Sequence, residues 1–543
     1  MRTLFIILFS LITLLSAHGQ TKREVRAVWL TTAYGLDWPK SAATTDAGIH
    51  RQKQALCNIL DSLKSANFNT VLFQTRLRGD VLYPSAIEPF NEILTGKEGK
   101  EPGYDPLAFA IEECHKRGLE FHAWVVSMPL GTRKHVASLG SKSVTKKKPA
   151  ICKQYKGEWF LNPGMPETKE YLFSIIKEIV TRYDVDGIHL DYIRYPDHPK
   201  NFPDADTYRK YGAKKELSQW RRDNITAIVR HIYNGVKVLK PWVKVSSSPL
   251  GKYKDTSRYP SGGWNGYHAV FQDAQGWLKE GIQDMIFPMM YFIGNNFYPF
   301  ALDWQEKCYG RQIIPGLGIY FLHPSERDWP LGEIEREIYF IRDYHLAGQA
   351  YYRMEFLQNN TKGIMDMLKQ KFYRTPAIPP AISWMDSMPP SIPQALTCVR
   401  ESGNVYLNWQ ASTDNDTQNR PTYIVYASNR YPVDTEKAGN IVAAQIKGTT
   451  YVCADTKRYY AVTAIDRYGN ESSASQLPPP SQRQKQKVDA DYICITDAIG
   501  APLLSEPYTG TLPMDKLNEG IYKVIYLKDG RIVKEEVIYT NQH

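Results

Sequence analysis

Cysteine is scarce in this chain, and its spacing excludes the common cysteine-based sites. The 543 residues include seven cysteines, which are widely separated and form no CxxC pair and no His/Cys cluster. Such spacing is typical neither of a disulfide scaffold nor of a zinc site. The sequence also lacks a phosphate-binding glycine loop and a dinucleotide-binding fingerprint. We therefore predict a protein with no metal site and no cofactor.

A hydrophobic run long enough to span a bilayer is absent as well. The N-terminal segment MRTLFIILFSLITLLSAHGQ has one early positive charge, an apolar run from Leu4 to Leu15, and small residues after it. This pattern is typical of a secretory signal peptide, and the run is too short for a membrane-spanning helix. We predict a signal peptide over residues 1–19, no membrane span, and an exported protein that is periplasmic or secreted.

Acidic residues are missing from one long stretch. Residues 133–156 contain eight Lys and Arg and no Asp or Glu, although the whole chain carries a modest net charge of +10. One interpretation is a solvated mobile loop, and the other is a basic rim that attracts an anionic polymer. The second interpretation predicts an anionic polymer as the partner, and we predict no nucleic-acid partner.

Short apolar strands alternate with helical patterns over most of the chain. Strands are expected at 24–32, 70–76, 120–126, 186–193, 243–249, 285–292, 313–320 and 348–357. Eight strands that are each followed by a helix predict an α/β fold, a (β/α)₈ TIM barrel over residues 20–375. Nearly continuous apolar strands agree with a parallel sheet that helices cover.

Three further segments follow the barrel. Residues 376–390 are rich in proline, which predicts an extended and stiff linker. Residues 391–477 show short alternating strands, with Trp409 on an early strand and YYAVTAIDRYGNES near the end, and resemble a fibronectin type III β-sandwich. Residues 488–543 predict a small all-β module, in which KDGR forms a hairpin turn.

The expected barrel strands end in carboxylates, arginines and aromatics, which are the groups that a sugar polymer requires. In a TIM barrel such ends meet at one mouth, and glycoside hydrolysis needs two carboxyl groups that flank one bond. Asp191, at the end of DVDGIHLDYIRYP, is our first catalytic carboxylate, and we expect Arg194 to keep it ionised. Alternatively, these two residues form an ion pair that only organises the rim. Glu355, on the eighth strand, is our second catalytic carboxylate, and Asp37 and Asp80 are its alternatives.

Other side chains at the same strand ends are candidates for substrate binding. They are Asp37, Trp38, Gln74, Arg76, His122, Trp124, Tyr192, Arg194, Tyr195 and Tyr291. The aromatic rings either stack on sugars or pack as a lid over the barrel. His122 either donates a hydrogen bond to a sugar hydroxyl or has a structural role.

Several blocks resemble the glycosyl hydrolase-like 10 family of bacterial envelopes, in the family's order and across residues 23–374. They include REVRAVWLTTAYGLDWP, LFQTRLRGDVLYPS, FLNPGMPE, VDGIHLDYIRYP and WLKEGIQDMIFPMMY. The same blocks are similar to those of divisome-localised glycoside hydrolases that act on peptidoglycan strands stripped of their peptides. This chain departs from the family pattern at residues 125–129, at Met289 and at Met354, which removes side chains that would hydrogen-bond a sugar.

The resemblance implies an exported glycoside hydrolase that cleaves a bacterial envelope polysaccharide, with peptidoglycan glycan strands as the leading substrate. Two alternatives stay open. One is a non-catalytic glycan-binding envelope protein, and the other is a hydrolase of an imported polysaccharide. The distance between the two carboxyl groups would separate retaining chemistry, at about 5 Å, from inverting chemistry, at about 6.5–9.5 Å.

Overall fold

The structure, a computed structural model, describes residues 20–212, 214–258, 264–416, 419–479, 488–497, 499–518 and 520–540. The expected signal peptide, residues 1–19, lies outside these ranges. The chain divides into two compact units, one that ends at Gln476 and one that begins at Leu477. Within the described ranges, no helix combines the length and the apolar character that crossing a membrane requires.

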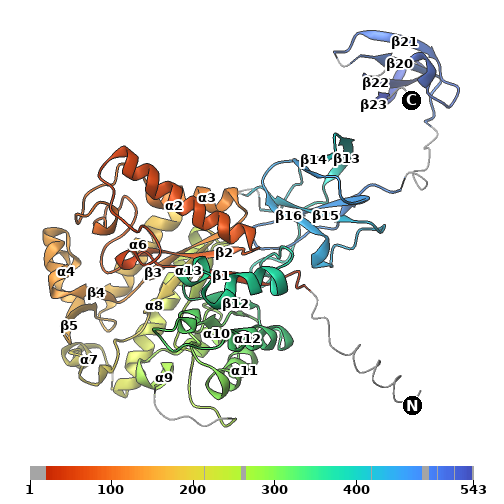
Figure 1. Cartoon of the computed structure of the whole chain (residues 1–543). Helices are drawn as coiled ribbons and strands as arrows, with labels where there is room; N and C mark the ends of the chain where they lie inside the picture. The colour runs from red at the N-terminus through yellow and green to blue at the C-terminus, as the bar shows by residue number, and fades with distance from the viewer. Residues whose placement is uncertain are drawn as a thin grey trace, which may run out of the picture. The chain divides into compact units, whose positions relative to one another are not determined.

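A parallel sheet curls into a barrel in the first unit (Figure 1). Its strands are β1 (Val25–Leu30), β2 (Thr70–Arg76), β3 (Glu120–Val126), β7 (Gly187–Asp191), β8 (Lys244–Ser247), β9 (Met285–Ile286), β10 (Gln312–Ile313), β11 (Gly316–Leu317) and β12 (Gly348–Tyr351). The order is β10-β9-β8-β7-β3-β2-β1-β12-β11. The two ends of this order, β10 and β11, are consecutive pieces of one stretch that Pro315 interrupts, because proline has no N–H for the ladder. The sheet therefore closes as a TIM-barrel-like domain.

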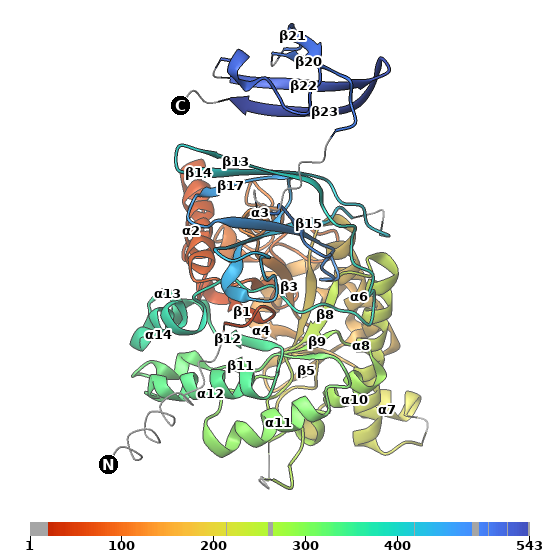
Figure 2. The ribbon, with the colours of Figure 1, turned by 90° about the vertical axis from the view of Figure 1, so that its right-hand side faces the viewer.

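Helices follow the barrel strands and cover the outside of the sheet (Figure 2). They are α2 (Asp46–Ser65), α3 (Pro106–Lys116), α6 (Pro166–Arg182), α8 (Leu217–Leu239), α10 (Ala274–Glu280), α11 (Tyr298–Glu306), α12 (Leu331–Asp343) and α13 (Met354–Gln358). Further short helices lie in the connecting segments, namely α4 (Arg133–Ser138), α5 (Val144–Lys147), α7 (Ala205–Tyr211), α9 (Gly266–Ala269) and α14 (Ile364–Met367). Helix α8 buries Ile225, Ile228 and Ile232, which lie three or four residues apart and therefore on one face. The alternation that the sequence predicts is confirmed.

The basic stretch is folded. It lies in an insertion after β3, in which β4 (Pro129–Thr132), β6 (Glu158–Leu161) and β5 (Cys152–Tyr155) form an antiparallel sheet in that order, with α4 and α5 between β4 and β5. Lys153 pairs with Asp206 at 2.9 Å, and Lys147 donates to the Ile87 carbonyl at 2.8 Å. The interpretation as a mobile loop is therefore wrong.

Two antiparallel sheets occupy the end of the first unit. One contains β13 (Gln394–Glu401), β14 (Asn404–Gln410) and β17 (Thr450–Ala454), and the other contains β16 (Ile441–Ile446), β15 (Thr422–Ser428), β18 (Tyr459–Ile465) and β19 (Ser475–Gln476). Trp409 is buried and its ring meets that of Tyr423 edge-on at 5.2 Å. The region is all-β, as expected, and its assignment as a fibronectin type III domain stays a prediction.

The proline-rich segment lies against the base of the barrel and is not a free spacer. Arg23, just before β1, forms a parallel bridge with Ile378. The Gln312 side chain donates hydrogen bonds to the carbonyls of Pro380 at 3.1 Å and Ala381 at 3.0 Å. The Ile382 backbone N–H donates to the Tyr468 carbonyl, in the β18–β19 loop, at 2.8 Å. The Arg23 guanidinium donates to the carbonyls of Pro379 at 3.4 Å and Gly469 at 3.0 Å. These contacts join the barrel and the two sheets into one compact unit.

The second unit is a single antiparallel sheet. Its order is β21-β20-β22-β23, with β20 (Tyr492–Thr496), β21 (Pro502–Pro507), β22 (Gly520–Lys528) and β23 (Arg531–Thr540). Asp529 and Gly530 join β22 to β23, and both have positive φ angles, of 51° and 71°. This is the turn geometry that favours Asp-Gly in a two-residue hairpin, so the predicted hairpin is confirmed.

Candidate active site

A cavity of about 670 Å³ opens where the barrel strands end. This is the size of an ordinary small-molecule site, and it lies at the end of the barrel where functional residues gather. The strand ends and the residues just beyond them contribute Trp29, Gln74, Trp124, Asp191, Tyr192, Ser248, Met289, Tyr291 and Tyr352. The surrounding loops and the insertion after β3 contribute Tyr34, Arg78, Asn91, Glu92, Lys134 and His135.

Asp191 is the last residue of β7 and its carboxylate lies in the floor of the pocket. One oxygen accepts hydrogen bonds from the Tyr192 backbone at 2.8 Å and the Ser248 hydroxyl at 3.0 Å, and the other accepts from the Trp124 indole at 3.1 Å. Burial raises the pKa of Asp191 above its ordinary value, and these hydrogen bonds and the Arg194 charge partly offset the rise. A carboxyl group with a raised pKa is suited to donate a proton.

Arg194 does not pair with Asp191. Its guanidinium forms an ion pair with Asp197 at 2.6 Å and lies over the Tyr192 ring at 4.8 Å. The Arg194 charge lowers the pKa of Asp191, as expected, but burial outweighs it and the net shift is upward. The alternative of an organising Asp191–Arg194 ion pair is wrong.

A buried polar layer lies under the pocket and explains the polar sequence of β7. His189 precedes Asp191 by two residues, so both side chains point into the barrel. The Trp29 indole donates to Nε2 of His189 at 3.1 Å, which leaves Nδ1–H to donate to the Ser246 hydroxyl at 3.0 Å. Burial, with a smaller contribution from His122, holds the pKa of His189 well below its usual value. The imidazole is therefore neutral and orients Trp29 in the floor.

Three tyrosines form an aromatic wall at one side of the site. Tyr291 and Tyr352 stack with ring centroids 5.5 Å apart and planes at 26°, and Tyr320 meets Tyr291 edge-on at 5.7 Å. The rings of Tyr291 and Tyr352 line the cavity. Sequence reasoning named Tyr291 but missed Tyr352. Its position directly after the strand GQAY was the signal that could have found it.

The pocket contains five of the predicted residues, namely Gln74, Trp124, Asp191, Tyr192 and Tyr291. Trp38 and Tyr195 do not reach it, because both are buried in the hydrophobic core between the barrel and its helices. Arg76 is also buried, and its guanidinium binds the Glu88 carboxylate through two hydrogen bonds of 2.8 and 2.7 Å. These three residues support the fold and do not line the predicted substrate site.

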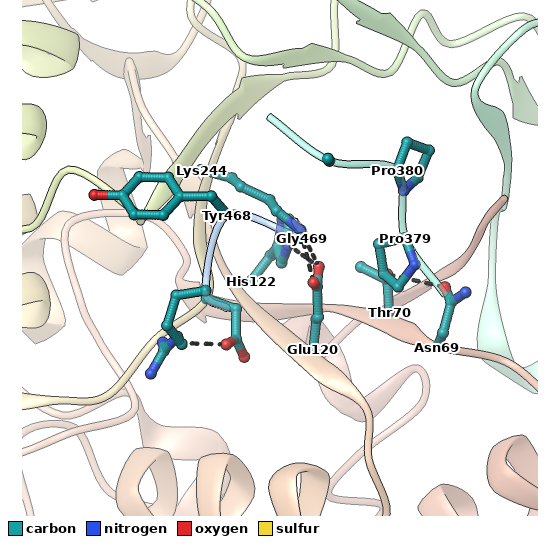
Figure 3. Close-up of polar contacts among 12 residues, drawn as sticks. Asn69, Thr70, Glu120, His122, Lys244, Pro379, Pro380, Tyr468 and Gly469 are labelled. Carbon is teal, nitrogen blue, oxygen red and sulfur yellow. Dashed lines mark hydrogen bonds and ion pairs between the residues drawn. The ribbon is translucent and has the colours of Figure 1, made fainter. Parts of the chain in front are cut away.

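His122 lies at the opposite end of the barrel. It pairs in register with Gly187, the first residue of β7, whereas the pocket lies beyond the last. Its Nε2 is 3.4 Å from Glu120, which forms a 2.6 Å ion pair with Lys244 (Figure 3). The expected contact with a sugar is wrong, and the structural alternative is correct.

Glu355 belongs to a helix and not to the eighth strand. β12 ends at Tyr351, and Glu355 lies in the first turn of α13 (Met354–Gln358). Its carboxylate pairs with Arg353 at 2.6 Å and does not line the pocket. The buried Asp37 also stays below the surface, where Oδ1 binds Arg353 at 2.7 Å and the Glu355 backbone N–H at 2.8 Å. Neither Asp37 nor Glu355 lines the pocket, so neither is positioned as the second carboxylate beside Asp191.

Glu92 is the other carboxylate that the described structure places in the pocket lining. It begins the short 3₁₀ helix η2 (Glu92–Leu94) in the long loop after β2. Nearby, Asp80 accepts hydrogen bonds from Asn91 at 2.6 Å and from the Arg78 backbone at 3.0 Å, and so organises this wall. Sequence reasoning missed Glu92 because no strand end marks its position.

The chain is similar to several known proteins. The chain is 34% identical over 490 residues to glycosyl hydrolase YngK of Bacillus subtilis, covering 85% of this chain and 94% of that protein. It is 34% identical over 294 residues to glycosyl hydrolase DigH of Escherichia coli, covering 50% of this chain and 66% of that protein. Among solved structures, the PgaB (BpsB) glycoside hydrolase domain of Bordetella bronchiseptica superposes with a TM-score of 0.44 at 15% identity, over 64% of this chain and 99% of that chain. The sequence profile of the glycosyl hydrolase-like 10 family matches residues 24–321. The chain therefore belongs to the glycosyl hydrolase-like 10 family.

Proposed function

We propose that this protein is an exported glycoside hydrolase that cleaves the glycan strands of peptidoglycan, with Asp191 as its general acid. The observation that carries the proposal is the carboxyl group of Asp191, which is buried in the floor of the pocket and held by three hydrogen bonds. Its raised pKa favours the protonated form that a departing glycosidic oxygen requires. The N-terminal pattern supports export, and relatives that carry the name glycosyl hydrolase support the reaction class.

The lining of the pocket fits an amino-sugar polymer that bears carboxylates. The stacked rings of Tyr291 and Tyr352 line the cavity, which suits the apolar face of a sugar ring. Arg78, from the loop after β2, and Lys134, from α4, supply positive charge to the lining. Peptidoglycan strands freed of their peptides retain the lactyl carboxylate of every muramic acid residue, so this charge favours them over neutral glycans.

Glu92 is our candidate for the second carboxylate. In this role it activates the water that attacks the anomeric carbon, or attacks that carbon itself, while Asp191 protonates the leaving oxygen. The non-catalytic alternative predicts that no bond is cleaved and that neither carboxylate takes part in a chemical step. A glycan-binding protein would use the same tyrosines and cations without bond cleavage.

The test is digestion of peptide-free peptidoglycan strands, with products identified by mass spectrometry. We expect cleavage by the wild type and a loss of at least about 10³-fold in Asp191→Asn, with binding of the strands retained. Glu92→Gln is expected to lose about 10²-fold or more, whereas Glu355→Gln stays within about threefold of the wild type. Retention of the strands without products would establish the binding protein. A large loss of cleavage activity in Glu355→Gln would instead identify Glu355 as the second catalytic carboxylate.

A neutral β-1,4-linked N-acetylglucosamine oligomer is the matched control substrate. Faster cleavage of this oligomer than of the muramic-acid polymer would reject peptidoglycan but keep the glycosidase. Inactivity on both, with an intact thermal unfolding transition, would direct the search to imported polysaccharides.

A further inference from the structure

Asp80, Glu98 and His135 meet beside the pocket although they lie up to 55 positions apart in the sequence. Each offers one ligand atom, and these atoms all lie within 4.8 Å of one another. Nε2 of His135 is 3.3 Å from Asp80 Oδ2, and Nδ1 is 3.4 Å from Glu98 Oε1. No short sequence motif contains the three residues, which is why the sequence alone predicts no metal site.

Glu98 is the unusual member of this cluster. Its side chain is 8% exposed. Among the described residues its buried carboxylate oxygens form no hydrogen bond of good geometry, although Nδ1 of His135 lies 3.4 Å from Oε1. A buried carboxylate that accepts no hydrogen bond is costly, and native structures contain few such groups. A cation between Glu98 and its neighbours would satisfy these oxygens.

His135 is oriented as a metal ligand. Its Nε2 lies 3.0 Å from the Arg78 carbonyl, which can only accept a hydrogen bond, so Nε2 carries the proton. Nδ1 is therefore the ring nitrogen that faces Glu98, at 3.4 Å from Oε1. Ligating histidines commonly donate their other ring N–H to a carbonyl or a carboxylate in this way.

Asp80 is held in place by its own partners. Its oxygens accept hydrogen bonds from the Arg78 backbone at 3.0 Å and from the Asn91 amide at 2.6 Å, and the residue is fully buried. Hydrogen-bonded carboxylates of this kind are typical of the ligands at preformed metal sites. The cluster thus has an oriented carboxylate, an oriented imidazole and a buried carboxylate without a good hydrogen bond.

We propose that Asp80, Glu98 and His135 bind one divalent transition-metal ion, with Zn²⁺ as the best match. Two carboxylates and a neutral imidazole balance the double positive charge, and imidazole nitrogen favours Zn²⁺ over the oxygen-seeking Ca²⁺ and Mg²⁺. The ligands come from the turn after β2, the segment after η2 and helix α4. The ion therefore ties together the three segments that carry Arg78, Glu92 and Lys134 in the pocket wall.

The test is metal binding by untagged protein that has been stripped with a chelator and dialysed. Titration calorimetry with ZnCl₂ and elemental analysis are expected to give one Zn²⁺ per chain. Affinity should fall more than tenfold in Glu98→Gln and in His135→Gln. The exposed residues Glu101 and His50 supply the controls Glu101→Gln and His50→Gln, which should bind as the wild type does.

Two further measurements need only the wild type. Zn²⁺ should raise the unfolding temperature of the first unit, and Co²⁺ in its place should give visible d–d absorption. Failure of the stripped wild type to bind a stoichiometric ion would overturn the proposal and identify the cluster as a protonated histidine between two carboxylates. Equal Zn²⁺ affinity in Glu98→Gln would overturn it as well.

Discussion

The indole N–H of Trp124 donates a 3.1 Å hydrogen bond to Oδ2 of Asp191, from one barrel strand to the next. In the register of β3 and β7, Val126 lies opposite Asp191 and Trp124 lies opposite His189. Trp124 therefore reaches diagonally toward the carboxyl end of its neighbour, and its ring forms part of the pocket floor. One residue both shapes the floor and tunes the carboxyl group.

Trp124→Phe should move the pH dependence of the proposed reaction. The hydrogen bond stabilises the ionised form of Asp191, so its loss raises the pKa of this carboxyl group further. If the protonated form acts as general acid, the alkaline limb of the kcat/KM profile moves to higher pH, by about one unit or less. A profile measured on cleaved glycan strands tests this. Displacement of the acidic limb instead would show that catalysis requires the ionised carboxylate.

Tyr352→Ala should weaken substrate binding more than the chemical step. The ring stacks on Tyr291 and lines the cavity, so its removal takes apolar contact area from the bound sugar. Burial of an aromatic ring contributes about 1.5–3 kcal/mol, and we expect KM to rise about tenfold or more. Tyr352→Phe keeps the ring and should stay close to the wild type. An equal effect of both substitutions would point to the hydroxyl and not to stacking.

Asp186→Asn should flatten the acid limb of the stability curve. Burial raises the pKa of Asp186, but a 2.8 Å contact with His115 and the charge of Arg467 outweigh it and hold the pKa below the ordinary 3.8. A depressed carboxyl pKa stabilises the fold above the unfolded value, and this contribution is lost as pH falls below about 4. Thermal unfolding between pH 3 and 6 measures the slope.

Asp184→Asn is the matched control, because Asp184 also pairs with Arg467, at 2.8 Å, but its side chain is 53% exposed. Its substitution should change the slope much less. Parallel curves for the wild type and Asp186→Asn would contradict this account of the barrel base.

Glu337→Met should stabilise the protein at neutral pH. Glu337 is 1% exposed in α12, and its carboxyl oxygens have no hydrogen-bond partner among the described residues. Burial, with the nearby Glu333, raises the pKa of Glu337 well above its ordinary value. A raised carboxyl pKa costs stability as pH increases from the unfolded value toward the folded one. The gain, about 1–3 kcal/mol, should therefore be larger at pH 8 than at pH 5 in urea unfolding.

Glu333→Gln removes the neighbouring charge and leaves the buried carboxyl group in place. It should produce a smaller gain than Glu337→Met, because desolvation is the larger cause of the shift. A loss of stability in Glu337→Met at every pH would mean that the methionine side chain does not fit the site.

The eighth strand shows where sequence patterns stop being sufficient. GQAYYRMEFL is largely apolar and predicts one continuous strand over 348–357, but β12 ends at Tyr351 and α13 begins at Met354. Asp37, near the start of the barrel sequence, determines where the strand ends and the helix begins. Its carboxylate binds both Arg353 and the backbone N–H of Glu355. A local pattern cannot contain a contact that spans more than 300 residues.

The sequence by itself determined the order of the barrel strands and the position of Asp191 at the end of β7. β2 and β3 match the expected ranges 70–76 and 120–126, because strands buried on both faces are continuously apolar and the polar residue that ends such a strand marks the mouth. Tertiary structure decided which polar residues reach that mouth. Arg76 binds Glu88 and His122 lies at the base of the barrel, whereas Glu92 reaches the pocket from a loop. The reason is that the cost of burying a polar or charged group depends on its partners, and these are distant in the chain.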